Sequence, residues 1–167
     1  MSLTKNKYLL TILGPTAIGK TALSIILANH FNTEIISCDS RQFYKEMTIG
    51  TAVPSKEELQ AAKHHFIQNR SVFDAYSVGQ YERDALQSLN ELFKTNDVVI
   101  LVGGSGLYVD AVLKGLDYFP EVKPEIRAQL NQELEEFGIA HLQQQLKELD
   151  IETYTSIALE NPHRVIR

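Results

Sequence analysis

The sequence contains no tryptophan and only one cysteine, Cys38, in 167 residues. A single thiol cannot build a disulfide framework or a cysteine-rich zinc site, and it fits a reducing compartment. No apolar run is long enough to span a bilayer, and the first residues lack the apolar centre of a secretory signal peptide. We therefore expect a cytoplasmic protein with no membrane partner.

Positive charge is also in short supply. The chain has 16 Lys and Arg against 21 Asp and Glu, which gives a formal net charge of −5. This balance argues only weakly against a nucleic-acid partner, because such binding depends on a local basic surface. With 44% hydrophobic residues the chain can bury a sizeable core, and its length fits one domain or one domain and part of another.

The most informative stretch is Gly14–Thr21, which fits the phosphate-binding pattern G-x-x-x-x-G-K-[ST]. The apolar run Tyr8–Leu13 before it predicts a buried strand, and Ala22–Ala28 after it predicts a helix. In a loop between strand and helix, successive backbone N–H groups close around a phosphate. The residues expected at this phosphate are Gly14, Pro15, Thr16, Ala17, Ile18, Gly19, Lys20 and Thr21. Lys20 is expected to meet terminal phosphate oxygens, and the Thr21 hydroxyl to bind a magnesium ion.

Two further strands are predicted. Thr33–Ser37 ends just before Asp39, and the apolar run Asp97–Val102 ends in a second glycine-rich loop, Gly103–Tyr108. The carboxyl ends of parallel strands share one ligand-binding edge, so both ends are expected to face the phosphate loop. Asp39 has two possible roles at this point, a functional carboxylate in the cleft or the cap of a turn.

Helices are predicted between and after these strands. Ser55 and Glu58 form a capping box at the start of one helix, and another helix begins near Tyr76. His64 and His65 follow the first of them and are expected on a helix, pointing to different sides. A shared metal is therefore disfavoured, and structural or substrate-edge roles are expected instead.

The composition changes after Gly115. Asp117–Pro120 resembles a linker, and Glu125–Glu136 and Ile139–Leu149 predict two amphipathic helices with no strand between them. We expect an α/β core over residues 1–118 and a helical insertion over residues 119–167. The final stretch Pro162–Arg167 predicts the opening of another helix, so we expect the chain to be part of a longer protein.

Phosphate binding alone leaves kinases, ATPases and transferases open. Several stretches together, in this order, resemble the tRNA dimethylallyltransferases, a family of isopentenyl-diphosphate:tRNA transferases. They are Gly14–Thr21 (GPTAIGKT), Ser37–Tyr44 (SCDSRQFY), Met47–Ala52 (MTIGTA), His64–Phe66 (HHF), Gly103–Tyr108 (GGSGLY) and Asn161–Arg167 (NPHRVIR). The resemblance covers essentially the whole chain. It implies a P-loop NTPase-like, nucleoside-kinase-like parallel sheet flanked by helices.

The resemblance also implies a reaction. In this family the loop holds the diphosphate of dimethylallyl diphosphate rather than ATP, and the product is N6-dimethylallyladenosine beside the tRNA anticodon. Thr16–Thr21 would bind the diphosphate, with Thr21 on Mg²⁺, and Asp39 matches the general base. Positions matching tRNA contacts are Asp39, Ser40, Arg41, Gln42, Ser105, Arg127, His163, Arg164, Val165, Ile166 and Arg167.

This sequence departs from the family pattern at two of these positions. Ser105 stands where the family usually has Thr, and His163 replaces a common Gln. Family members continue beyond Arg167, where further sheet strands, another arginine for the diphosphate and much of the tRNA surface are expected. We expect a monomer.

Other functions remain open on the sequence. An adenylate isopentenyltransferase, which acts on free nucleotides, shares the loop, and an ATP-dependent small-molecule or nucleotide kinase uses the same loop with ATP. A kinase needs a lid that carries arginines, and only Lys123 and Arg127 lie near the stretch after Gly115. A non-catalytic nucleotide-binding module is disfavoured by the intact Lys20 and Asp39.

Overall fold

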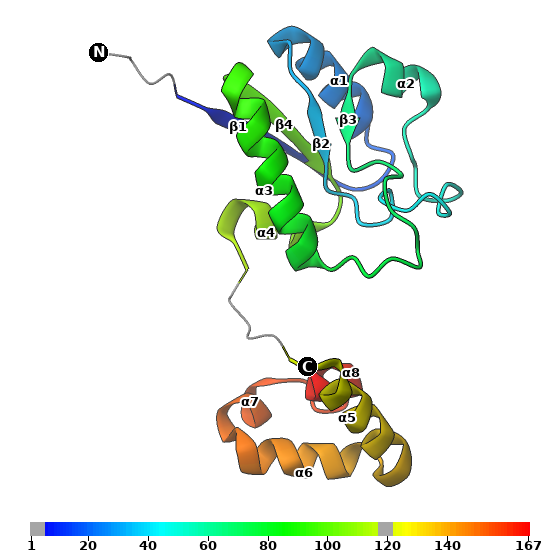
Figure 1. Cartoon of the computed structure of the whole chain (residues 1–167), viewed down its shortest axis with the longest axis vertical. Coiled ribbons are helices and arrows are strands. Elements are labelled where there is room, and N and C mark those ends of the chain that lie inside the picture. The colour runs from blue at the N-terminus through cyan, green and yellow to red at the C-terminus, as the bar shows by residue number, and fades with distance from the viewer. Residues whose placement is uncertain (1–5, 117–121) are drawn as a thin grey trace. The chain divides into compact units, whose positions relative to one another are not determined.

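The computed structural model describes residues 6–116 and 122–167 and divides into two compact units, Met1–Asp117 and Tyr118–Arg167 (Figure 1). The domain boundary expected after residue 118 lies outside the described residues. Among the described residues, no helix is long and apolar enough to cross a membrane.

The first unit is built on a parallel sheet. Its strands are β1 (Tyr8–Leu13), β2 (Ile35–Ser37), β3 (His64–His65) and β4 (Val98–Gly103), in the order β1-β4-β2-β3. All three strand pairs are parallel. Helix α1 (Lys20–Phe31) makes the crossover from β1 to β2. The predicted α/β fold with a parallel sheet is confirmed.

Helices cover both faces of this sheet, which explains why β4 is almost wholly buried. Side chains alternate between the faces of a strand. Val99 and Leu101 pack with residues of α3 (Val78–Thr95) and α4 (Gly106–Lys114), whereas Ile100 packs with Ala28 of α1.

The structure corrects the expectation that His64 and His65 lie on a helix. Helix α2 (Lys56–Ala61) ends before them, and Ala62 is already extended, with φ −153° and ψ 145°. The N–H of Ile35 then binds the carbonyl of Lys63 at 2.9 Å, and the two histidines continue this pairing as the short strand β3. Tertiary pairing with β2, which no local pattern signals, determines this element.

Most predicted helix starts agree with the structure. The capping box of Ser55 and Glu58 is present at α2, and a second one, of Ser77 and Gln80, begins α3. Strand β2 begins at Ile35, two residues later than predicted.

The second unit is helical. It contains α5 (Pro124–Phe137), α6 (Ile139–Leu149), α7 (Ile151–Ser156) and α8 (Pro162–Ile166). The two helices predicted from the sequence are confirmed as α5 and α6. Helix α7 was not predicted; Asp150 caps it through the N–H of Thr153.

Candidate active site

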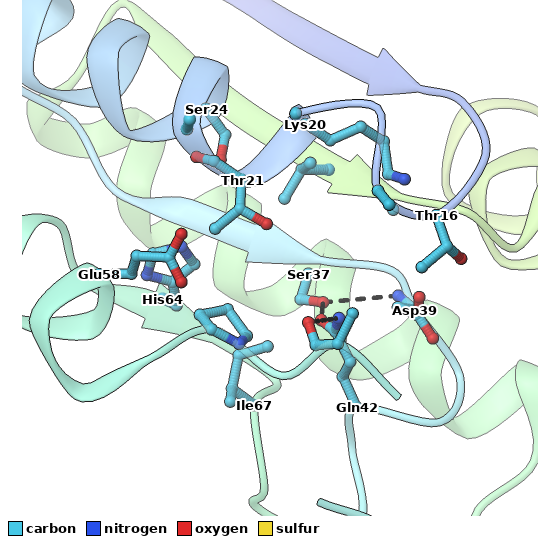
Figure 2. A pocket seen from close by; sticks show the side chains of 17 residues that line it. Thr16, Lys20, Thr21, Ser24, Ser37, Asp39, Gln42, Glu58, His64 and Ile67 are labelled. Carbon is cyan, nitrogen blue, oxygen red and sulfur yellow. Dashed lines mark hydrogen bonds between the residues drawn. The ribbon is translucent and has the colours of Figure 1, made fainter. Parts of the chain in front are cut away.

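A cleft of about 260 Å³ lies at the carboxyl ends of β1, β2 and β4 (Figure 2). The phosphate-binding loop and the start of α1 form one wall, and the segments after β2, around α2 and at β3 form the other. The lining residues are Thr16, Ala17, Gly19, Lys20, Thr21, Ala22, Ser24, Ser37, Asp39, Gln42, Ala52, Pro54, Glu58, His64, Ile67, Val102 and Gly103.

The loop backbone is shaped for an anion. Gly19, the residue before α1, has φ 95°, a left-handed conformation that glycine adopts at least cost. A Cβ on Gly19 would meet no atom within 4 Å, so conformation rather than space favours glycine here. Ala17 is also left-handed, with φ 67°. No side chain caps α1, so its first amide groups and its dipole remain available to a negatively charged ligand.

Lys20 and Thr21 follow at the first turn of α1. The ammonium of Lys20 donates to the carbonyl oxygen of Pro15 at 2.7 Å, within the loop. The carbonyl of Thr21 accepts a hydrogen bond from the buried Ser24 hydroxyl at 2.8 Å. These contacts place the Lys20 ammonium beside the loop and leave the Thr21 side chain in the cleft, as Figure 2 shows.

Asp39 lies in a tight turn just after β2. Its carbonyl accepts the N–H of Gln42 at 3.0 Å, and its Oδ1 accepts the N–H of Arg41 at 3.2 Å. A Cβ added to Gly104 would lie 3.9 Å from Oδ2 of Asp39 and 3.6 Å from the carbonyl oxygen of Gly14. The carboxylate therefore both caps its turn and lines the cleft, between the two glycine-rich loops.

The end of β4 comes very close to the segment before Asp39. A Cβ on Gly103 would lie 2.5 Å from the Sγ of Cys38 and 2.7 Å from its carbonyl carbon, so no larger residue fits without a shift. Burial, followed by the negative charge of Asp39, raises the pKa of the Cys38 thiol to about 12. The thiol therefore stays protonated and packs in the core rather than acting as a nucleophile.

The Gln42 side chain holds the backbone of the cleft wall that faces the phosphate-binding loop. Its amide nitrogen donates to the carbonyls of Thr51 (3.1 Å) and Ala52 (2.8 Å), and its carbonyl oxygen accepts from the Ser37 hydroxyl at 3.4 Å. Both amide hydrogens are thus engaged with the Met47–Ala52 segment. The contact of Gln42 with tRNA stays a prediction.

Glu58 and His64 complete that wall. The sequence did not assign Glu58 to the site, and for His64 it left a structural and a substrate-edge role open. Nδ1 of His64 donates to the carbonyl of Ala62 at 2.8 Å, which leaves Nε2 as the ring's acceptor. Burial lowers the pKa of His64, so the ring is neutral near pH 7. Its Nε2 is buried and has no hydrogen-bond partner among the residues that the structure describes. The two adjacent histidines can be recognised in the sequence. Only the strand geometry directs His64 into the cleft and His65 toward Glu34.

The remaining predicted residues lie elsewhere. Ser40 and Arg41 follow Asp39 in its turn, and Ser105 precedes α4 and binds Ser40. In the second unit, α8 carries His163, Arg164, Val165 and Ile166. A groove of about 210 Å³ within that unit brings Arg127 together with Ile166 and Arg167 over apolar residues of α5.

A phosphate loop between β1 and α1, with a carboxylate at the end of the second strand, defines an α/β protein of the P-loop NTPase type. The profile of the IPP transferase family matches residues 42–167, which is more than half of the chain. The chain belongs to this family.

The names of similar proteins agree with this family. The tRNA dimethylallyltransferase of Flavobacterium johnsoniae is 68% identical over 156 residues, which cover 93% of this chain and 50% of that protein. The solved tRNA isopentenylpyrophosphate transferase of Bacillus halodurans is 35% identical, with a TM-score of 0.64, over 98% of this chain and 54% of that one. A eukaryotic dimethylallyltransferase acting on tRNA shares the fold, with a TM-score of 0.81 at 24% identity, over 97% of this chain and 40% of that one. The chain spans about half the length of the curated relatives it matches.

Proposed function

We propose that this chain carries the donor-binding and catalytic cleft of a tRNA dimethylallyltransferase. The enzyme would transfer a dimethylallyl group from dimethylallyl diphosphate to N6 of the adenosine next to the anticodon. The observation that carries this proposal is the cleft itself, which places Lys20 and Thr21 on one wall and Asp39 at the adjoining strand end. Membership of the IPP transferase family and the named relatives support the choice of reaction.

The first requirement of the reaction is stabilisation of the departing diphosphate. The donor's allylic C–O bond breaks, and its electron pair leaves with the diphosphate oxygen. The loop amides, the N-terminal dipole of α1 and the Lys20 ammonium supply fixed positive potential where this charge develops. Lys20 must exchange its bond to the Pro15 carbonyl for the phosphate oxygens.

A magnesium ion fits the chemistry of the cleft. Mg²⁺ takes oxygen ligands and often only one or two from the protein, the rest coming from phosphates and water. The Thr21 hydroxyl is the residue we assign to it. Among the described residues no group of three or more His, Cys, Asp and Glu side chains could hold a metal, so the assignment rests on the Thr21 hydroxyl. When bound, the ion would neutralise part of the diphosphate charge.

The second requirement is an acceptor for the proton of the attacking amine. As adenine N6 forms its bond to the allylic carbon, it loses one proton, and Oδ2 of Asp39 is the carboxylate oxygen that the turn leaves unengaged. The adenine must leave its base stack to reach a cleft of this kind. Arg127, Arg164 and Arg167 are proposed to contact the tRNA backbone.

One assay tests the proposal. The full-length protein is incubated with radiolabelled dimethylallyl diphosphate, Mg²⁺ and bulk tRNA that lacks the modification. Label in the RNA is the expected outcome. Label only in added free adenine nucleotides would identify an adenylate isopentenyltransferase instead, and ATP-dependent phosphorylation without prenyl transfer would indicate a kinase.

A further inference from the structure

Ser105 occupies a helix start without capping the helix. Four other polar residues at this position, Ser55, Ser77, Asp150 and Asn161, accept a hydrogen bond from a backbone N–H of their own helix. Ser105 immediately precedes α4, yet its hydroxyl makes no such bond. A side-chain cap stabilises a helix by about 1 kcal/mol, so the hydroxyl is diverted from a favourable local contact.

The hydroxyl is directed at the turn that holds Asp39. Oγ of Ser105 accepts the backbone N–H of Ser40 at 3.3 Å and lies 3.2 Å from the Ser40 hydroxyl. The N–H groups on either side of Ser40 are used locally: that of Asp39 reaches Ser37 Oγ at 3.5 Å, and that of Arg41 reaches Asp39 Oδ1 at 3.2 Å. Ser105 is therefore the partner that ties this turn to the second glycine-rich loop.

The hydrogen bonds between Ser105 and Ser40 lie where the second glycine-rich loop packs closely against the segment after β2. One residue before Ser105, a Cβ on Gly104 would lie 3.9 Å from Asp39 Oδ2, and Gly103 packs directly against Cys38. The backbone just before the turn is thus held by close contact at Cys38, while the turn itself is half-buried at Asp39 and Ser40 and exposed at Arg41. The Ser105 hydroxyl, which accepts the N–H of Ser40, holds this less buried part of the turn.

We propose that Ser105 is a positioning residue for Asp39. Its hydroxyl holds Ser40 and thereby keeps the adjacent Asp39 carboxylate aimed into the cleft, where the proposed function requires it to accept a proton. A hydroxyl has one hydrogen and two acceptor lone pairs. Two of these three capacities are used on Ser40, which favours an internal role over the tRNA contact implied by family resemblance.

The test compares Ser105→Ala, Ser105→Thr and, as a matched control, Ser77→Ala in the full-length protein. Ser77 also precedes a helix, but its hydroxyl caps α3 itself. Ser105→Ala should lower kcat about tenfold, with KM for donor and for tRNA within about threefold, since one or two neutral hydrogen bonds are lost. Ser105→Thr keeps the hydroxyl and should retain at least about half of kcat. Ser77→Ala should lower the melting temperature and leave kcat unchanged.

A double-mutant cycle separates positioning from general damage. If Ser105 acts through Asp39, Ser105→Ala should cause no further loss of single-turnover rate in an Asp39→Asn background. Full additivity of the two losses would overturn the proposal. So would a raised KM for tRNA with unchanged kcat, which would make Ser105 a tRNA contact.

Failure of the proposed function would look different, because the unsubstituted protein would then transfer no dimethylallyl group to tRNA. If Ser105→Ala melts too low to assay, Ser40→Ala replaces it, because it removes one of the two bonds and leaves the Ser40 N–H in place. A kcat lowered about threefold in that variant supports the proposal, and an unchanged kcat opposes it.

Discussion

The two units of the chain hold their side chains in different ways. In the first unit, hydrogen bonds join residues far apart in sequence: the buried Tyr81 hydroxyl donates to the Ser37 carbonyl, 44 positions away, at 2.9 Å. In the second unit, many side-chain bonds are local, as between Gln132 and Glu136 at 2.8 Å, four positions apart. Leu142 is buried there, whereas Leu149 remains 86% exposed.

Under the proposed function, this difference suits the two units to separate tasks. Long-range bonds and a two-sided core hold the cleft residues in place, which is what a site for bond breaking requires. The second unit leaves its arginines on the surface, which suits contact with a phosphate backbone. Under the proposed function, substitutions of the cleft residues in the first unit should therefore change kcat, and substitutions of the arginines in the second unit should change tRNA affinity and its salt dependence.

The largest expected effect belongs to Lys20→Ala. Removing the ammonium beside the loop withdraws charge from the departing diphosphate and should cost about 3 kcal/mol or more of transition-state stabilisation, which abolishes measurable transfer. The measurement is turnover at saturating donor. Lys94→Ala, which removes an exposed ammonium at the end of α3, is the control and should have no effect. Near-normal turnover of Lys20→Ala would remove Lys20 from the diphosphate site.

The second-largest expected effect is that of Asp39→Asn. The amide keeps the size of the carboxylate but not its basicity, so the rate should fall about a hundredfold or more, with donor and tRNA affinities within a few-fold. Asp110→Asn is the control, because Asp110 is an exposed residue of α4 that pairs with Lys114. If added magnesium restores the rate of Asp39→Asn, Asp39 is a metal ligand and not the proton acceptor.

The second unit is tested with Arg164→Ala. Arg164 is exposed on α8, and no ion pair of its side chain occurs among the described residues. If it meets a phosphate, its loss should weaken tRNA binding severalfold and lower the log–log salt slope by about one, while kcat at saturating tRNA is kept. Lys147→Ala, which removes an exposed ammonium from α6, is the control for charge alone. An unchanged slope would contradict a phosphate contact.

Features of the fold and the site could be predicted from the sequence where the residues that determine them lie close together along the chain. The phosphate loop with β1 and α1 was predicted because strand, glycine loop and helix are encoded within about 25 consecutive residues. Strand β3 was missed because pairing with β2, rather than any local alternation, makes it a strand. For the same reason the sequence could not place His64 in the cleft, or bond Ser105 to Ser40 across 65 positions.

The smallest expected effect concerns the pH dependence of a long-range ion pair in the first unit. Glu34 is bonded to His65 at 2.5 Å and paired with Lys63 at 3.0 Å. Burial would raise the pKa of Glu34, but the hydrogen bonds from His65 and Lys63 outweigh it and hold that pKa below 4.5. Because the folded pKa is depressed, the stabilisation is present above the unfolded pKa of about 4.5 and is lost as pH falls through the folded value.

Glu34→Gln removes this charge and should lower the free energy of unfolding at pH 7 by a few tenths of a kcal/mol to about 1 kcal/mol, because the pair is partly exposed. The difference from the unsubstituted protein should shrink as the pH falls from about 4.5 through the folded pKa, because Glu34 takes up its proton first in the unfolded and then in the folded state. Urea unfolding at pH 7 and pH 4 measures it. Glu148→Gln, which alters a local contact with Gln144 in the second unit, should show no such pH dependence. An equal loss at both pH values for Glu34→Gln would mean that packing, not charge, holds β3 against β2.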